Sequence, residues 1–316
     1  MARAAISVRS PSSSLRSSWK RTWLRQETLE GYLFAAPAIL GYLIFVLGPV
    51  ITSLIMSLAE YNIIKPPVFI GVQNYITAFT DDELFWTSVR VTVFYTIIAV
   101  PLNLIVGFLI AVLMNQKVNG MSIFRTIWYM PAIVPAVANA VLWQWVLNPD
   151  FGLLNLLLGK LGIPGPRWLI VPNTAIPAFI LMNLWGVGGG MLIYLGGLQG
   201  IPQHLYEAVE IDGGNWWARF RHVTIPMMTP VIFFNLIIGL INTFQVFTPA
   251  FVMTQGGPAY ATYFYVLHLY KNAFQYLRMG YASAMAWILM LFVLLMTFII
   301  FRTSGWVYYE GGEANR

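Results

Sequence analysis

The 316-residue sequence has no cysteine, and only 9% of its residues are charged. Without cysteine there are no disulfides, no thiolate nucleophiles and no cysteine-based metal sites. A soluble domain carries about a quarter charged residues, whereas this chain is 58% hydrophobic. The composition therefore indicates a polytopic membrane protein. The net charge of +6 is explained by basic residues held on the cytoplasmic side of a membrane, so we expect no nucleic acid partner.

The sequence also lacks the residues that would power transport or perform chemistry. The central turns of its long apolar runs contain no ionisable side chain, which argues against a proton pathway. The only Gly-Lys pair, Gly159-Lys160, is followed by leucine and has no phosphate-loop glycine upstream. The three histidines have no metal-ligand spacing. We therefore expect no catalytic residue, no metal site and no cofactor in this chain.

Apolar runs long enough to span a bilayer, about 20 residues each, predict six transmembrane helices. They lie near residues 31–58, 88–115, 123–147, 175–198, 230–252 and 280–302. Residues 1–30, rich in Ser and Arg, are expected to form a disordered tail, and residues 304–316 a second tail. The fold class predicted is an all-α polytopic membrane protein, with its transmembrane domain at residues 31–303.

The distribution of Lys and Arg predicts the orientation. With the N-terminus inside, twelve of them lie on the cytoplasmic side and six on the outer side. The positive-inside rule then places both termini, and the loop at residues 201–230, in the cytoplasm.

The loop at residues 201–230 is unusually rich in charge and reads as two short helices. Pro202 suits the first turn of a helix, and Gly213 and Gly214 can end it with positive φ. Asn215 is a plausible N-cap for a second helix. Pro226 is expected to stop that helix.

Residues 207–214 read E-A-V-E-I-D-G-G and are followed after ten residues by Ile225-Pro226. This stretch resembles the E-A-A-x-x-x-D-G-A…(I/L)-P loop of ABC-importer permeases, although Val209 and Gly214 stand where alanine is usual. In that family the loop forms the coupling helices that dock into a separate ATPase subunit. The alternative is an ordinary amphipathic linker at the membrane interface. The resemblance implies an ATPase-coupling role for Glu207, Ala208, Asp212, Gly213, Trp216, Phe220 and Pro226.

Three outer loops are similar to those of sugar-importer permeases. Residues 69–75 read F-I-G-V-Q-N-Y, residues 148–155 read N-P-D-F-G-L-L-N, and residues 254–258 read T-Q-G-G-P. By resemblance they form a landing surface for an extracytoplasmic solute-binding protein. Taken singly, each is also explained by Gly, Pro and Asn making turns.

Polar but uncharged helix faces suggest a polar, uncharged solute such as a sugar, because amides both donate to and accept from hydroxyls. Asn242 and Gln245 are three residues apart and are expected to share a face near the middle of the fifth helix. By resemblance, this segment is where the maltose-system permease holds its sugar. The alternative is that amides join helices and glycines allow close packing. The same resemblance points to Asn183, Gly186 and Gly190 in the fourth helix, where a glycine-rich wall either widens the cavity or leaves the sugar contacts to the partner subunit. The candidate substrate-binding residues are Asn183, Gly186, Gly190, Asn242, Thr243, Gln245 and Phe247.

The sequence thus resembles a sugar-type, binding-protein-dependent ABC permease, closest to the maltose-system F type. The resemblance implies a homologous second permease, two ATPase subunits that hold ATP and Mg, a solute-binding protein, and residence in a bacterial or archaeal plasma membrane. A sodium-coupled carrier working alone is one alternative, since backbone carbonyls can hold sodium. A membrane-embedded enzyme is another.

Overall fold

The computed structural model describes residue 28 and residues 30–308. It separates into two units, Met1–Ile55 and Met56–Arg316, which are described one at a time. Within the described residues, the only strands form one two-residue pair, β1 (Ala59–Glu60) and β2 (Val68–Phe69), which run antiparallel. The predicted all-α class is therefore confirmed. Most of both predicted tails lies outside the described residues.

The part of the first unit that the structure describes belongs to the first span, which runs from Glu30 to Ser57 and so ends in the second unit. It is helical throughout, with a π-helical turn at Leu43–Leu47 before α2 (Gly48–Ser57). At 1.5 Å per residue its 28 residues give a length of about 40 Å. This exceeds the thickness of a hydrocarbon core, so the helix is long enough to span.

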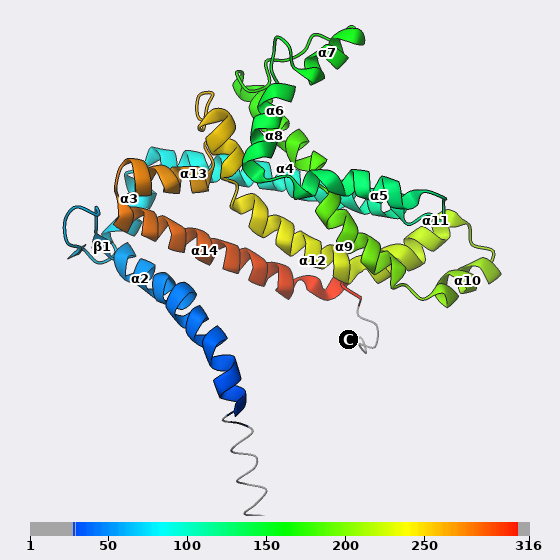
Figure 1. Cartoon of the computed structure of the whole chain (residues 1–316), viewed down its shortest axis with the longest axis horizontal. Coiled ribbons are helices and arrows are strands. Elements are labelled where there is room, and N and C mark those ends of the chain that lie inside the picture. The colour runs from blue at the N-terminus through cyan, green and yellow to red at the C-terminus, as the bar shows by residue number, and fades with distance from the viewer. Residues whose placement is uncertain (1–27, 29, 309–316) are drawn as a thin grey trace, which may run out of the picture. The chain divides into compact units, whose positions relative to one another are not determined.

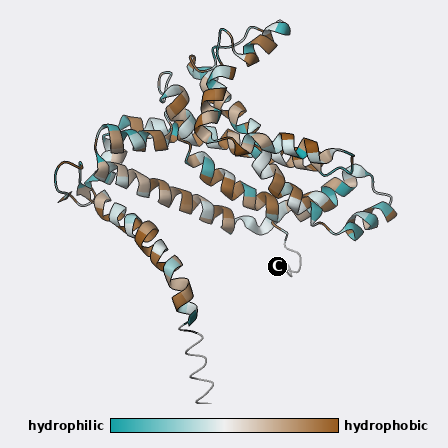
Figure 2. Ribbon diagram, viewed as in Figure 1, coloured by the Kyte–Doolittle hydropathy of each residue, from teal (hydrophilic) through white to brown (hydrophobic). Residues whose placement is uncertain are grey.

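The described residues hold six candidate spans in all, the first span included, if each bent helix pair counts as one, and this agrees with the number that the sequence predicts. The helices of the second unit are α3 (Gln73–Thr80), α4 (Glu83–Met114), α5 (Met121–Tyr129), α6 (Ala136–Val146), α7 (Leu153–Lys160), α8 (Pro172–Trp185), α9 (Gly188–Gln199), α10 (Gln203–Ile211), α11 (Trp216–Arg219), α12 (Ile225–Phe244), α13 (Tyr265–Tyr270) and α14 (Met279–Arg302). Apolar residues dominate α12 and α14, whereas α10 is largely hydrophilic (Figure 2).

Helix α4 is the centre of the second unit and packs against α8, α9 and α12 (Figure 1). It begins at an N-cap, Asp82, whose carboxylate accepts a hydrogen bond from the Phe85 N–H at 3.1 Å. Such a cap satisfies a backbone donor at the helix start. Pro101 lies inside the helix, where it cannot donate a hydrogen bond to the Ile97 carbonyl one turn earlier.

Two spans are broken rather than continuous. Helix α5, extended by a 3₁₀ turn at Met130–Ile133, is bent by 100° from α6 across Val134-Pro135. Helices α8 and α9 are bent by 45° at Gly186-Val187. At the second bend a Cβ on Gly188 would lie 2.1 Å from the Trp128 carbonyl oxygen. Only glycine therefore lets α9 approach the third span this closely.

The prediction that Pro226 stops a helix is wrong. The chain is helical from Trp216 to Phe244, a single 29-residue span. A π-helical turn at Phe220–Thr224 comes directly before Pro226. A π-helical turn changes the pattern of backbone hydrogen bonds locally. It lies at the point where Pro226, which has no N–H, cannot donate a hydrogen bond to a preceding carbonyl. The fifth span accordingly begins and ends earlier than predicted.

Shorter elements connect the spans. After α12 the chain forms a π-helical turn, then α13, then a second π-helical turn, and α14 is followed by a 3₁₀ turn. These segments are Ala250–Thr254, Lys271–Gln275 and Ser304–Trp306. The last turn leads back onto α12, where the Tyr308 N–H donates to the Thr229 hydroxyl at 2.8 Å.

A buried polar network joins α4, α13 and α14 at the start of α4, and sequence reasoning did not find it. His268, 2% exposed, lies with its Nε2 2.7 Å from Asp82 Oδ2, and the Tyr281 hydroxyl donates to the same oxygen at 2.7 Å. The Tyr263 hydroxyl is 3.1 Å from His268 Nδ1. A neutral imidazole that donates from Nε2 and accepts at Nδ1 satisfies every one of these contacts.

The pKa values of this pair follow from the same contacts. Burial lowers the pKa of His268 below 6.5, and the nearby Lys271 charge lowers it further, against the opposing influence of Asp82. Burial raises the pKa of Asp82, but hydrogen bonds from Tyr281, His268 and the Phe85 N–H outweigh it and bring the pKa below 3.8. A neutral histidine bound to an ionised carboxylate is the result.

This network predicts a pH-dependent stability. Below about pH 6.5 the unfolded chain binds a proton at residue 268 that the folded chain does not. The free energy of unfolding therefore decreases as the pH is lowered through this range. We expect the melting temperature of the purified transporter to drop between pH 7.5 and 5.5. The drop should be smaller in His268→Gln, and His222→Gln, at an exposed position, serves as the control. Parallel pH curves for wild type and His268→Gln would contradict this.

Candidate functional site

A cavity of about 520 Å³ lies among the spans of the second unit. Helices α4, α6, α8, α9 and α12 all contribute side chains to it. Its polar and glycine lining consists of Asn103, Asn139, Asn183, Gly186, Gly189, Gly190, Tyr194, Asn235, Gly239, Asn242 and Thr243. None of its lining residues is Asp, Glu, Lys, Arg or His, so the cavity offers hydrogen bonds without a formal charge.

Several of these polar groups are already paired within the protein. The Asn103 amide donates to the Asn183 side-chain oxygen, which joins α4 to α8. Asn235 donates to the Val231 carbonyl at 2.9 Å, and the Thr243 hydroxyl to the Leu240 carbonyl at 3.1 Å. Such bonds fix the orientation of the remaining acceptor and donor atoms.

The glycines of α8 and α9 form an open wall of the cavity. A Cβ on Gly190 would lie 3.4 Å from Asn235 Oδ1, and one on Gly186 3.4 Å from a backbone carbonyl. A large side chain at either position would extend into space that a solute could fill. The absence of side chains on this wall therefore enlarges the cavity.

Five of the seven predicted substrate residues line this one cavity, and two do not. Gln245 and Phe247 are not among the lining residues, and both follow the end of α12 at Phe244. Gln245 is the exposed C-cap residue. Phe247 instead packs on Phe251 and Tyr270, with ring centroids 5.3 and 4.9 Å apart.

Sequence reasoning did not assign the remaining polar residues of the cavity to the site. Asn103, Asn139 and Asn235 were visible as neutral amides, but nothing in the sequence brings their helices together. Tyr194 follows Gly190 by four residues, so helical spacing alone could have placed it on the same face. Without that spacing, Tyr194 would be interpreted as one more aromatic residue in an apolar run.

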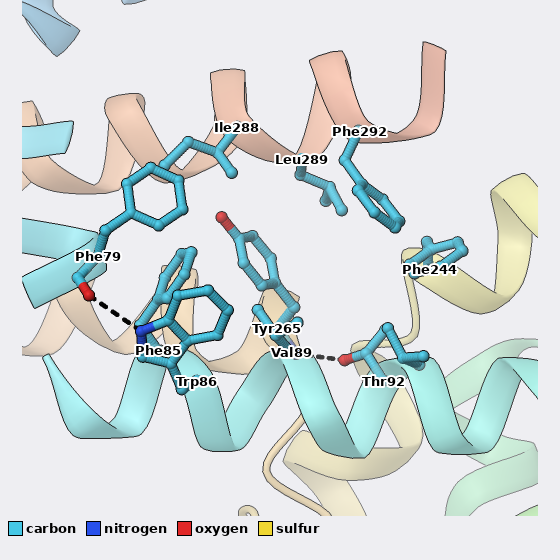
Figure 3. Close-up of a pocket in the computed structure, with 11 residues that line it drawn as sticks. Phe79, Phe85, Trp86, Val89, Thr92, Phe244, Tyr265, Ile288, Leu289 and Phe292 are labelled. Carbon is cyan, nitrogen blue, oxygen red and sulfur yellow. Dashed lines mark hydrogen bonds between the residues drawn. The ribbon is translucent and has the colours of Figure 1, made fainter. Parts of the chain in front are cut away.

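A second, smaller cavity of about 310 Å³ differs in chemistry (Figure 3). It is lined by apolar and aromatic side chains of α3, α4, α12, α13 and α14. The Thr92 hydroxyl accepts from the Tyr265 N–H at 2.9 Å, and Trp86 Nε1 donates to the Phe79 carbonyl at 3.0 Å. Because its polar groups are already bonded, this cavity has little to offer a hydroxyl-rich solute.

The loop at residues 201–230 forms the predicted pair of helices, α10 and α11. Gly213 ends the first with φ +78°, a conformation that favours glycine. Asn215 caps the second, accepting from the Ala218 N–H at 3.0 Å. An ion pair between Glu210 and Arg219 holds the two helices together. We call residues 203–219 the hairpin.

The two residues that depart from the family pattern, Val209 and Gly214, lie next to each other in the structure. A Cβ on Gly214 would lie 2.4 Å from the Val209 Cγ1 atom and 2.8 Å from the Val209 carbonyl oxygen. The valine therefore leaves no room for the alanine that is usual at position 214. The larger residue at one position is matched by the smaller residue at the other.

Four aromatic rings connect the hairpin to the cavity. Trp216, 56% exposed, stacks on Phe220 with centroids 5.3 Å apart, and Phe220 stacks on Phe108 at 6.1 Å. Phe108 meets the Tyr194 ring edge-on at 5.6 Å. The structure thus places Phe220 between the hairpin and α4, whereas Trp216 is at the surface.

The other predicted coupling residues are at the hairpin surface or just beyond it. Glu207, Ala208 and Asp212 are exposed. Ile211 and Trp217 add apolar surface beside them, at 86% and 55% exposure. Pro226 is instead in the first turn of α12, half-buried. An exposed surface that mixes carboxylates with large apolar groups is typical of a protein-binding face.

Membrane spans around an uncharged cavity, with an exposed helical hairpin at one end of the fifth span, define a transport protein. The chain belongs to the family of binding-protein-dependent transport system inner membrane components, which matches residues 103–307. It is thus a permease subunit of an ABC importer. Family membership removes the alternatives of a carrier working alone and of a membrane-embedded enzyme.

Two curated relatives cover nearly the whole chain. A probable ABC transporter permease protein of Bacillus subtilis, YesP, is 41% identical over 92% of this chain and 95% of its own length. The trehalose/maltose transport system permease protein MalF of Thermococcus litoralis is 34% identical over 92% of this chain and 96% of its own. The resemblance to the maltose-system F type is confirmed.

Among solved structures, the chain is similar to a subunit of a bacterial ABC transporter involved in import of the acidic polysaccharide alginate. The TM-score is 0.78 at 25% sequence identity, covering 92% of this chain and 98% of the other. The permease fold is therefore shared along almost the full length.

Proposed function

We propose that this permease carries a neutral, hydroxyl-rich solute, namely an oligosaccharide, a glycoside or a related polyol, into the cytoplasm. The observation that carries this proposal is the uncharged, amide-lined cavity among the spans. Amide side chains pair with hydroxyls in both directions. A charged solute would enter the low-dielectric interior without a counter-charge, at a high desolvation cost.

The relatives support a saccharide but differ in its charge. One is described as a trehalose/maltose permease, and a structural neighbour as importing an acidic polysaccharide. No arginine, lysine or histidine lines the cavity of this chain. The absence of a cationic group favours a neutral saccharide over an acidic one.

The energy is proposed to come from partner subunits. The sequence carries no phosphate-loop motif, so ATP and Mg would be held by two ATPase subunits, and a homologous permease would complete the pore. The hairpin would dock on the ATPase through Glu207, Asp212 and Trp216. Ala208 provides a small docking surface, and Gly213 the turn.

One continuous helix offers a mechanical path for coupling. Residues 216–244 form a single helix that begins in the hairpin and ends at the cavity lining, with Asn235 and Asn242 near its far end. Pro226 and the π-helical turn before it lie at its base. A displacement of α11 by ATPase closure would thus move one wall of the cavity directly.

The orientation follows from the charges. The hairpin and both termini would face the cytoplasm, with the loops around α3, α7 and α13 on the outer side. Those loops would receive a solute-binding protein. The location proposed is the plasma membrane of a bacterium or archaeon.

The solute class is tested by a sugar screen. The purified assembly with its binding protein, in proteoliposomes, should hydrolyse ATP several-fold faster with one or more of maltose, trehalose, lactose or arabinotriose. Galacturonic acid oligomers should have no effect, because the cavity has no cation. Stimulation by the acidic oligomers alone would contradict the proposal.

The orientation is tested by cysteine labelling, which the cysteine-free sequence makes direct. In intact cells a membrane-impermeant maleimide should label Lys160→Cys and should not label Gln203→Cys. After permeabilisation both should react, since both positions are exposed. Labelling of Gln203→Cys in intact cells would overturn the assigned orientation.

The hairpin turn is tested at Gly213. A β-branched residue is strained at φ +78° by at least 1–2 kcal/mol, roughly the cost of left-handed backbone. We expect Gly213→Val to insert in the membrane but to lose most of its copurifying ATPase and its ATP-driven uptake. Gly213→Asn is the matched control, because asparagine tolerates this conformation. Equal ATPase recovery in both variants would refute the role of the turn.

A further inference from the structure

Two polar side-chain links leave helix α10, and both end on the same helix. Glu210 forms an ion pair with Arg219, and the Tyr206 hydroxyl lies 3.1 Å from the Thr224 hydroxyl. Arg219 and Thr224 both belong to the continuous helix of residues 216–244. No other side chain of α10 has a hydrogen bond or an ion pair within the described residues. The links therefore connect α10 to the helix that lines the central cavity.

The spacing of these residues gives a role to the π-helical turn at Phe220–Thr224. Tyr206 and Glu210 are four residues apart on an α-helix, so they share one face. Their partners are five residues apart, which on a regular α-helix would place them about 140° apart around the axis. The π-helical turn removes this mismatch, because its hydrogen bonds join residues five apart. The Ile225 N–H donates to the Phe220 carbonyl in this way.

The two partners show the same register. Thr224 Oγ1 lies 3.5 Å from the Arg219 carbonyl oxygen, five residues earlier. Thr224 is 7% exposed, whereas the side chains of Arg219 and Glu210 are 33% and 54% exposed. An exposed ion pair alone contributes little stability. Two links from one face, however, fix the angle between the two helices as well as their separation.

A cavity of about 320 Å³ borders these links. It is lined by Tyr206, Arg219 and Thr224, and also by Val112 and Leu198 from the last turns of α4 and α9. This part of the chain is therefore not packed tightly onto α4 and α9. A shift of α10 can be taken up by the cavity, whereas the two links carry the shift to the long helix.

We propose that Tyr206 and Glu210 are positioning residues that couple α10 to the helix of residues 216–244, with the π-helical turn setting the register of their partners. The two helices then move as one lever, and a displacement of the docked hairpin reaches Asn235 and Asn242 at the central cavity. This inference rests on the proposed docking of the hairpin on an ATPase. Neither positioning residue has to touch that subunit.

The ion pair is tested by exchanging its charges in the assembly purified with its ATPase and binding protein. Glu210→Arg alone brings two guanidinium groups together, and Arg219→Glu alone brings two carboxylates together. With whichever of maltose, trehalose, lactose or arabinotriose the wild type imports, each should lower the sugars imported per ATP hydrolysed about two- to fivefold. The double variant restores the pair and should recover wild-type coupling. Copurified ATPase should stay at the wild-type level throughout.

The hydroxyl link is tested by Tyr206→Phe and Thr224→Val, each of which removes one end of the same hydrogen bond. Each should lower the sugars imported per ATP about two- to tenfold. The double variant should be no worse than either, because partners in one contact are not additive. Thr126→Val is the matched control, since this exposed hydroxyl donates to the Ser122 carbonyl of its own helix. It should leave coupling unchanged.

A distance measurement reports the rigidity of the lever without transport. Because the sequence has no cysteine, spin labels at the exposed positions of Gln203→Cys and His222→Cys report the separation of α10 from the π-helical turn, in an assembly with cysteine-free partners. The wild type should give a narrow distance distribution and Glu210→Arg a broader one. The charge-exchanged double variant should return to the wild-type width.

The contrary outcomes are distinct. If the charge-exchanged variant stays as poorly coupled as Glu210→Arg, or if Glu210→Arg leaves the distance distribution unchanged, the pair does not form the lever and the proposal fails. If Glu210→Arg loses the copurified ATPase, Glu210 belongs to the docking surface, and the proposal fails while the ATPase-driven function stands. If the wild type retains no ATPase and imports none of the sugars, the proposed function fails, and the coupling role of both links fails with it.

Discussion

The hydrocarbon core of a membrane supplies no hydrogen bonds, and this constraint explains most of the structure. Every polar group placed among the spans must find its partner inside the protein. The Asn103–Asn183 pair joins two helices in this way, and the Asp82, His268 and Tyr281 network joins three elements at the start of α4.

The same constraint separates the binding and driving parts of the molecule. Charged residues of the described chain lie in the hairpin, in the loops and toward the ends of the helices, where water or a protein partner can satisfy them. The cavity is left polar but neutral. The continuous helix from Trp216 to Phe244 and the stacked rings of Phe220 and Phe108 link these two regions. Force applied at a charged surface can thereby reach an uncharged site.

Sequence reasoning succeeded where the signal was local. Asn215 and Gly213 were predicted to cap and end the helices of the hairpin, and both do. It failed where the path of the backbone depends on neighbours. Pro226 was expected to end a helix, but a π-helical turn before it lets the helix continue. Gln245 was expected to contact the solute together with Asn242, but only Asn242 lines the cavity.

The sequence alone determined the membrane setting, the six spans and the hairpin, because apolar run length, charge and turn residues act over a few neighbouring positions. Which side chains meet was decided only by the tertiary structure. Asn139, Asn183 and Asn242 come from three helices, and their convergence on one cavity depends on helix packing across long stretches of chain. No local pattern encodes that packing, because each amide could equally have faced another helix.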